Sequence, residues 1–302
     1  MANKQFYSPL RYPGGKGKLI SFIKSIYDSN RLKGNTYIEP YTGGGAVALS
    51  LLIDGYAENI IINDFDRSIY AFWYCLLNHT DELCQLINDT PITIDEWRRQ
   101  KDIQENKNTA GILELGFSTF FLNRTNRSGI IKAGVIGGIH QSGDWKMNVR
   151  FNKVDLLNRI EKIAQFKTKI DLYNLDTCEL LENINNNQNL YTDSFIYLDP
   201  PYYCKGKDLY VNFYKHQDHV FLSDKIKEIE NIKWLLSYDN QKEIVQLYEE
   251  FKKITYNLTY SVEKKYQGNE VLIYSDNIKL PIKKANLKNL QRIKRRNLVL
   301  NL

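Results

Sequence analysis

The residues best suited to chemistry form the run Asp199-Pro200-Pro201-Tyr202, which follows the apolar stretch SFIYL. Two successive prolines cannot continue a strand's hydrogen-bond ladder, and their fixed φ makes the backbone leave the strand in a set direction. Such a turn could aim the Asp199 carboxylate and the Pro200 carbonyl at the two N–H groups of an exocyclic adenine amine. Those hydrogen bonds would draw the nitrogen toward tetrahedral geometry and free its lone pair. The run predicts activation of an amine for group transfer, although a turn with a capping Asp and a packed Tyr is the alternative.

The aromatic ring of Tyr202 offers a flat face on which a base could stack, a contact worth about 1–3 kcal/mol in base-binding proteins. Holding the amine in line with a methyl donor would then provide most of the remaining rate acceleration. This chemistry requires no covalent intermediate, metal ion or catalytic cysteine. The predicted catalytic residues are Asp199, Pro200 and Tyr202.

A second run, TYIEPYTGGGAVALSLL at 36–52, is typical of a buried strand, a glycine turn and a helix. Glycines let a ligand approach the backbone closely, and the N-terminus of the following helix favours acceptor groups. Asp64 stands about 25 residues after Glu39, where nucleotide-binding sheets place the acceptor for ribose hydroxyls. The glycines lack the GxGxxG spacing of a pyrophosphate site, which favours S-adenosylmethionine over NAD. A purely structural turn, with Glu39 as a helix cap, is the alternative.

Near the N-terminus, RYPGGKGKL at 11–19 places an aromatic residue, a Pro-Gly-Gly turn and two lysines close together. The ammonium group of Lys16 could contact a carboxylate, such as that of the methionine part of a cofactor. An isolated surface turn would have the same composition.

Six short β-branched or aromatic runs must position these residues, and helical stretches separate most of them. This alternation predicts an α/β sheet covered on both faces. An Asn-rich segment at 183–190 is expected to be a loop. The expected strands lie at 36–40, 59–64, 169–176, 194–202, 233–240 and 270–276.

From about residue 75 to 165 the strand signals fade, and helical patterns surround a glycine-rich, basic centre at 123–146. We expect an inserted second domain between the second and third strands. Its basic residues could contact phosphates or guanine edges and its amides could read adenine, although a plain phosphate contact or a loop hydrogen bond is the alternative for each. The candidate DNA contacts are Asn123, Arg124, Asn126, Arg127, Lys132 and Gln141.

Composition fits a globular chain of one large or two smaller domains, with 43% hydrophobic and 25% charged residues among 302. The chain shows neither a signal-peptide pattern nor an apolar run long enough for a membrane span. We therefore expect a cytoplasmic protein with no membrane association. The four cysteines are widely separated and are expected to be reduced thiols.

The net charge of +6 is concentrated at the C-terminal end. No acidic residue follows Asp276, whereas eight basic residues do, which leaves 33 basic against 35 acidic residues in the rest of the chain. A basic tail suits a polyanionic partner through counterion release. A solvated extension or a docked amphipathic helix would fit the same residues.

In order along the chain, these motifs resemble the Dam-type (class alpha) family of adenine-N6 DNA methyltransferases. The resemblance covers roughly residues 8 to 280 and rests on RYPGGK at 11–16, YIEPYTGGGAV at 37–47, ND at 63–64, FFLNR at 120–124 and LDPPY at 198–202. It implies a Rossmann-like, S-adenosylmethionine-dependent methyltransferase sheet with an inserted, mainly helical recognition domain. The implied catalytic and cofactor-binding domain comprises residues 1–74 and 166–280, the DNA target-recognition domain 75–165 and the basic tail 281–302.

The resemblance also implies residue roles. Asp199 to Tyr202 match the family's catalytic loop, and Asp176 stands where an acid meets the cofactor's adenine. Tyr210 or Phe213 belongs to a loop that closes over the flipped base. The expected cofactor contacts are Tyr12, Lys16, Glu39, Gly43, Gly45, Asp64, Asp176 and Asp199.

The expected partner is double-stranded DNA, from which the adenine is flipped at a cost of a few kcal/mol, and a cognate restriction endonuclease is a further candidate partner. The insert departs from the best-known members of the family, so the recognised sequence stays open. Two alternatives also stay open. One is methylation of adenine in RNA or of cytosine N4, which shares the amine chemistry. The other is a DNA-binding regulator without activity.

Overall fold

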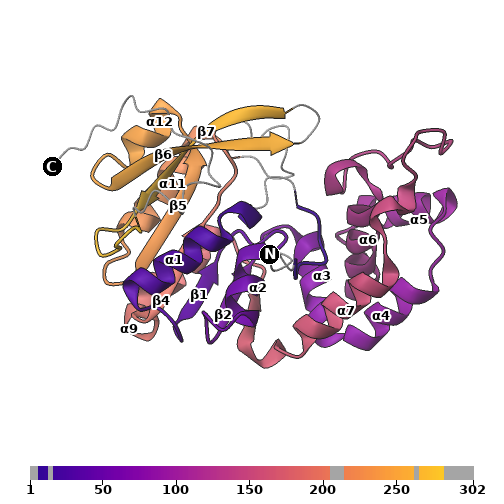
Figure 1. Cartoon of the computed structure of the whole chain (residues 1–302), viewed down its shortest axis with the longest axis horizontal. Coiled ribbons are helices and arrows are strands. Elements are labelled where there is room, and N and C mark those ends of the chain that lie inside the picture. Colours follow the sequence, from indigo (N-terminus) through magenta and orange to yellow (C-terminus); the bar gives the residue numbers. More distant parts are fainter. Residues whose placement is uncertain (1–5, 13–15, 205–213, 262–264, 282–302) are drawn as a thin grey trace.

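A computed structural model of the chain describes residues 6–12, 16–204, 214–261 and 265–281. Its centre is one seven-stranded sheet with the order β3-β2-β1-β4-β5-β7-β6 (Figure 1). Strands β3, β2, β1, β4 and β5 run parallel, and β7 is antiparallel to both β5 and β6. The strands are β1 (Thr36–Glu39), β2 (Ile60–Asn63), β3 (Ile170–Tyr173), β4 (Ser194–Leu198), β5 (Lys233–Asp239), β6 (Lys252–Ser261) and β7 (Lys265–Tyr274).

The strand order reverses between β1 and β4, because β1 leads to β2 on one side and β4 leads to β5 on the other. Sheets of this kind bind ligands in the crevice beyond the carboxyl ends of the strands at such a switch point. The glycine turn follows β1 and the Asp-Pro-Pro-Tyr run follows β4. Both motifs therefore begin at the same edge of the sheet.

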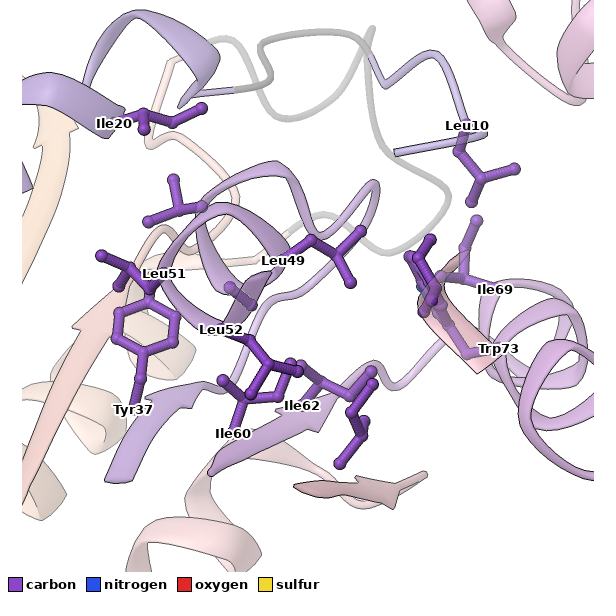
Figure 2. Close-up of a cluster of buried hydrophobic side chains, with 14 of the residues drawn as sticks. Leu10, Ile20, Tyr37, Leu49, Leu51, Leu52, Ile60, Ile62, Ile69 and Trp73 are labelled. Atoms are coloured by element: carbon purple, nitrogen blue, oxygen red, sulfur yellow. The ribbon is translucent and has the colours of Figure 1, made fainter. Parts of the chain in front are cut away.

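The two faces of the sheet carry separate hydrophobic cores, because successive side chains of a strand point to opposite faces. Tyr37 and Phe195 belong to the core beneath the first two helices, whereas Ile38 and Ile196 belong to the core on the other face. Figure 2 shows part of the first core, in which Leu51 and Leu52 lie over strands β1 and β2. All five residues of β4 are buried, as expected of a parallel strand covered on both sides.

Helices cover both faces of the sheet (Figure 1). Those of the sheet domain are α1 (Ile20–Asn30), α2 (Ala46–Ile53), α3 (Arg67–Asn78), α8 (Thr177–Asn186), α9 (Gln188–Tyr191), α11 (His216–Lys227) and α12 (Lys242–Leu247). Those of the inserted segment, which follow α3 and precede β3, are α4 (Thr80–Asp89), α5 (Ile94–Glu105), α6 (Ile112–Thr125) and α7 (Lys153–Ala164). Short 3-10 turns are η1 (Lys16–Lys18), η2 (Arg127–Gly129), η3 (Met147–Arg150) and η4 (Lys167–Lys169).

Helix α6 is the central element of the inserted segment. From Leu115 to Thr125 every residue except Arg124 is buried, so this part of the helix turns no face to solvent. It packs directly on α3, and Gly116 permits the close approach, since a Cβ there would lie 2.7 Å from the Ala71 carbonyl oxygen. The insert thus shares the first core with the sheet domain.

The six expected strands are confirmed, and the helices α4 to α7 lie between β2 and β3, where the insert was expected. Three features differ from expectation. Strand β6 was not predicted, because its sequence KKITYNLTYS is largely polar and lies at the sheet edge. The segment 183–190 is helical, in α8 and α9; Ile184 packs in the core, while most of its asparagines face outward. Helix α3 continues past the expected domain boundary after residue 74.

Several expectations concern residues outside the described ranges: the Pro-Gly-Gly turn at 13–15, Tyr210, Phe213 and the basic tail from 282 onward. Cys75 and Cys178 are buried, Cys84 is half-buried and Cys204 is exposed. In the described ranges, no helix combines the length and the apolar character that crossing a bilayer demands.

Candidate active site

A cavity of about 1300 Å³ opens at the carboxyl edge of the sheet, between the sheet domain and the insert. The sheet domain contributes acidic residues to its lining, including Glu39, Asp64, Asp176 and Asp199. The insert contributes basic ones, Arg124, Lys132, Arg150 and Arg159. Carboxyl groups therefore gather on the sheet side of the cavity and basic groups on the insert side, and Arg11 and Lys16 of the sheet domain also line it.

The glycine turn is tightly packed against the N-terminal segment. Gly43 and Gly45 have φ of +47° and +59°, a conformation that side chains rarely adopt. A Cβ on Gly43 would lie 2.7 Å from Cε1 of Tyr12, so the ring of Tyr12 lies directly on this backbone. The Trp73 indole N–H donates to the Gly43 carbonyl at 3.0 Å. The turn is fixed from both sides next to the cavity.

Asp64 and Asn63, at the end of β2, hold neighbouring loops in place. The Gly43 N–H donates to Asp64 Oδ2 at 2.8 Å, and burial raises the pKa of this carboxyl to about 7. The Asn63 amide donates to the Pro40 and Leu175 carbonyls at 3.0 and 3.1 Å, and its Oδ1 accepts from the Leu175 N–H at 2.9 Å. Sequence reasoning missed this role of Asn63.

Two of the predicted cofactor residues also cap helices. Glu39 accepts from the Ala48 N–H at 3.1 Å, in the first turn of α2, and burial raises its pKa well above the ordinary value. Asp176 accepts from the Cys178 N–H at 2.8 Å and is the N-cap of α8. Both carboxylates still line the cavity, so capping fixes their position without removing them from it.

The carboxylate of Asp199 lies at the end of β4 with two partners on the same oxygen. Its Oδ1 accepts from the Ser237 hydroxyl at 2.7 Å and lies 3.1 Å from Lys16 Nζ. Burial raises the pKa of Asp199, and the ammonium group and the hydroxyl oppose that rise. The contact joins two motifs that are far apart in sequence, PGGK and DPPY.

Beyond Asp199, Lys16 contacts a buried tyrosine and a second buried acid. Its Nζ donates to the Tyr202 hydroxyl, lies 4.7 Å from the Tyr202 ring centroid, and is 3.8 Å from Glu270 Oε1. The Tyr202 hydroxyl in turn donates to Glu270 Oε1 at 2.5 Å. Lys16 lines the cavity, but these contacts direct its ammonium group toward the Asp-Pro-Pro-Tyr run.

The Pro-Pro turn is held by an acid that sequence reasoning did not single out. Asp239, at the end of β5, accepts from the backbone N–H groups of Tyr203 and Cys204 at 2.9 and 3.0 Å. Pro200 is buried and Pro201 lines the cavity. A signal for Asp239 existed in the sequence, since it ends the strand next to the catalytic one.

Tyr202 differs from its expected role as a stacking platform. The side chain is buried, at 6% exposure, and its ring lies outside the cavity lining because Lys16 and Glu270 hold it below. The exposed aromatic residues at the cavity are Phe6, Phe65 and Phe221, at 56%, 56% and 52%. Nothing in the sequence pattern marked these three.

The three amides proposed as base readers use their polar atoms inside the protein. Asn123 accepts from the Arg11 N–H at 2.7 Å and donates to the carbonyls of Arg11 and Gly129 at 2.7 and 2.8 Å. Asn126 accepts from the Trp97 indole at 2.6 Å and donates to two carbonyls of the following loop.

Gln141 is likewise committed to its own loop. Its Nε2 donates to the Ile136 and Gly138 carbonyls at 2.8 and 2.7 Å, and its Oε1 accepts from the Met147 N–H at 2.8 Å. In this structure the three amides shape the recognition loops and present no polar group for a base.

The basic residues among the candidate DNA contacts are arranged differently from the three amides. Arg127 and Lys132 are exposed, and Lys132 lines the cavity. Arg124 donates to the Arg150 carbonyl at 2.7 Å, and burial beside Arg11, Arg159 and Arg150 lowers its pKa to about 10. This crowding of positive charge at the cavity suits a phosphate group.

The sheet side of the cavity fits S-adenosylmethionine. Its sulfonium and amino groups are cationic, and the cavity lining presents carboxyl groups at buried Glu39 and Asp64 and at half-buried Asp199. A nucleoside can approach a backbone closely only where side chains do not intervene. The turn at Gly43 meets this requirement, because it carries no side chain and a Cβ there would clash with Tyr12. In the described part of the chain, no group of three or more His, Cys, Asp or Glu could hold a metal ion.

Comparisons with known proteins agree with this chemistry. The family model of D12 class N6 adenine-specific DNA methyltransferases matches residues 12–262. The type II methyltransferase M.MjaIII of Methanocaldococcus jannaschii is 26% identical over 206 residues, which cover 64% of this chain and 68% of that protein. The modification methylase StsI of Streptococcus sanguinis is 24% identical over 208 residues, which cover 66% of this chain but only 29% of that protein.

Solved structures resemble the fold more distantly. A SAM-dependent methyltransferase from Agrobacterium tumefaciens has a TM-score of 0.42 at 8% identity, with 85% of this chain and 62% of that chain covered. The rRNA methyltransferase aviRa from Streptomyces viridochromogenes has a TM-score of 0.38 at 10% identity, with 93% and 90% covered. Such scores carry no argument about the substrate. The family match, which spans most of the chain, does: the protein belongs to the D12 class of N6 adenine-specific DNA methyltransferases and uses S-adenosylmethionine as its methyl donor.

Proposed function

We propose that the chain methylates N6 of one adenine within a specific duplex DNA sequence, after that adenine is flipped out of the stack. The single observation that supports this best is the position of Asp199. It directly follows β4 and lines the cavity, as the glycine turn does. Its Oδ1 accepts a hydrogen bond from Ser237 and forms an ion pair with Lys16. Because Oδ1 has these two partners, we assign Oδ2 to the adenine amine.

In this mechanism the protein binds and orients the adenine amine and takes up its proton. Asp199 Oδ2 and the Pro200 carbonyl accept the two N–H groups and free the nitrogen lone pair. S-adenosylmethionine supplies an electrophilic methyl carbon, and the electrons of the broken C–S bond stay on sulfur. The new N–C bond leaves the nitrogen with one proton too many, which Asp199 Oδ2 is placed to take. Its raised pKa favours that uptake.

We propose that the DNA backbone lies along the basic side of the cavity. Exposed Arg127 and Lys132, with Arg124 and Arg150, would neutralise phosphates next to the flipped nucleotide. In this arrangement Tyr202 supports Lys16 from below, and Phe65 or Phe221 offers the open aromatic face.

The biological setting we propose is a restriction-modification system in the cytoplasm, with a cognate endonuclease that recognises the same sequence. The support is that both curated relatives are named as enzymes of DNA modification, a type II methyltransferase and a modification methylase. The opposing possibility is a solitary enzyme that modifies host or phage DNA.

The test is single-molecule sequencing of DNA from a methylation-free bacterial host that expresses the chain. We expect N6-methyladenine at one enriched motif with the wild type, none with Asp199→Ala, and the wild-type pattern with Asp193→Ala, an exposed control. Modification by Asp199→Ala would refute the mechanism. No modification by folded wild-type protein would direct attention to RNA.

A further inference from the structure

The strongest feature that the mechanism has not used is the buried acid Glu270. It is 1% exposed and lies on β7, in register with Asp239 of β5 on one side and Tyr256 of β6 on the other. That register turns its side chain toward Lys16 and Tyr202. A carboxylate at such depth requires partners, since an unpaired buried charge costs several kcal/mol.

Both oxygens of Glu270 have partners. Oε1 accepts from the Tyr202 hydroxyl at 2.5 Å and lies 3.8 Å from Lys16 Nζ, and Oε2 accepts from the Tyr256 hydroxyl. Lys16 Nζ is also 3.1 Å from Asp199 Oδ1. One buried ammonium group therefore stands between the buried carboxylate of Glu270 and the half-buried carboxylate of Asp199, and of these two residues only Asp199 lines the cavity.

Two carboxylates that share one cation compete for it. If Glu270 lost its charge, the positive charge of Lys16 would act on Asp199 without the opposing charge of Glu270. Asp199 would then be a weaker hydrogen-bond acceptor for the amine and a weaker acceptor for the proton that the amine releases, because a neighbouring cation favours the ionised form. The charge of Glu270 moderates that effect.

We propose that Glu270 is a positioning residue for methyl transfer, which shares Lys16 with Asp199 and thereby keeps Asp199 basic enough to hold and deprotonate the amine. This proposal rests on the proposed function. It assigns Glu270 no contact with adenine or with the methyl donor. The residue acts through Lys16, and Tyr202 and Tyr256 fix its orientation.

The pH dependence follows from the groups that face Glu270. They are Lys16 from η1, Tyr256 from β6, Asp239 from β5, and Tyr197, Asp199 and Tyr202 from β4 and the turn after it. Burial raises the pKa of Glu270, and Lys16 and the two hydroxyls that donate to it oppose the rise. Removal of its negative charge should lower the pKa of Asp199, so activity should persist to lower pH while the plateau rate falls.

The test is the pH profile of kcat for Glu270→Gln on a duplex that the wild type methylates. The amide keeps the size of the side chain and can still bond both hydroxyls, so folding should be preserved. We expect kcat on the plateau to fall about tenfold with an unchanged KM for S-adenosylmethionine, and the acidic limb to move down by about one pH unit. Glu243→Gln, the same change at an exposed site, should match the wild type.

A second variant covers the case in which Glu270→Gln does not fold. Tyr256→Phe removes one donor from Glu270, which raises the pKa of Glu270, so we expect a smaller downward shift of the acidic limb. An acidic limb that stays at the wild-type position in a folded variant of either kind would overturn the proposal, whatever the rate. Inactivity of the wild type on all DNA would instead count against the proposed function.

Discussion

Replacement of Asn123 by Ala distinguishes a residue that holds the fold from one that reads DNA. The amide is 1% exposed and makes three hydrogen bonds, to the N–H and carbonyl of Arg11 and to the carbonyl of Gly129. Alanine would leave all three backbone groups without this partner. The N-terminal segment and the insert would thereby lose one link, while the bond from the Arg11 side chain to the Asn126 carbonyl would remain.

The expected cost follows from these contacts. Each hydrogen bond contributes about 1 kcal/mol net, and buried groups left unsatisfied add to the loss, so Asn123→Ala should lower the free energy of unfolding by about 3 kcal/mol or more. At roughly 2 °C per kcal/mol for a chain of this size, Tm should fall by about 6 °C. Asn158→Ala, an exposed change on α7, should leave Tm unchanged.

The assay pairs urea or thermal unfolding with DNA affinity measured well below Tm. We expect Asn123→Ala to lose stability and to keep the wild-type preference among target sequences, whereas Arg127→Ala should bind all DNA more weakly and unfold like the wild type. The reasoning fails if Asn123→Ala unfolds like the wild type but loses discrimination between sequences. That result would make Asn123 a base reader.

Three further outcomes are expected. Gly43→Ala should weaken cofactor binding about tenfold or more by calorimetry, because a Cβ would meet Tyr12 at 2.7 Å on a backbone with φ of +47°. Asp239→Asn should lower kcat and cost about 1–2 kcal/mol in urea unfolding, because an amide has one acceptor oxygen for two backbone N–H groups. Burial raises the pKa of Asp64 to about 7, so the folded state favours the protonated form of this carboxyl. Its contribution to the free energy of unfolding is present below pH about 4 and is lost as the pH rises through 7. Asp64→Asn should remove this part of the pH dependence, as measured by urea unfolding at several pH values.

Much of the fold could be predicted because the parallel strands are buried on both faces. Such strands consist of short, nearly continuous apolar runs, as in SFIYL of β4, and these are visible without any partner. Asp199 and the glycine turn could be found because prolines and glycines constrain the backbone locally. Edge strand β6 lacks that signal, since its partner β7 and not its own composition keeps it in the sheet.

The parts that could not be predicted depend on which polar groups meet across the chain. An asparagine that reads adenine and one that ties two loops together have the same side chain, and only the 2.7 Å contact between Asn123 and the Arg11 N–H decides between them. The same holds for Glu270. Its distance of 3.8 Å from Lys16 follows from the register of β7 and not from any local pattern.

The contact between α6 and α3 has a consequence for how target preference can diversify. Gly116 brings the two helix backbones together, so the insert is attached to the catalytic half through a buried joint and not through a flexible linker. The loop at 127–150 begins just beyond the end of α6. If the insert reads the DNA target, we expect that substitutions and length changes in that loop alter the recognised sequence, while the buried joint holds the base of the loop in place relative to Asp199. Exchange of this single segment between relatives would then be a route to new specificities on an unchanged sheet domain.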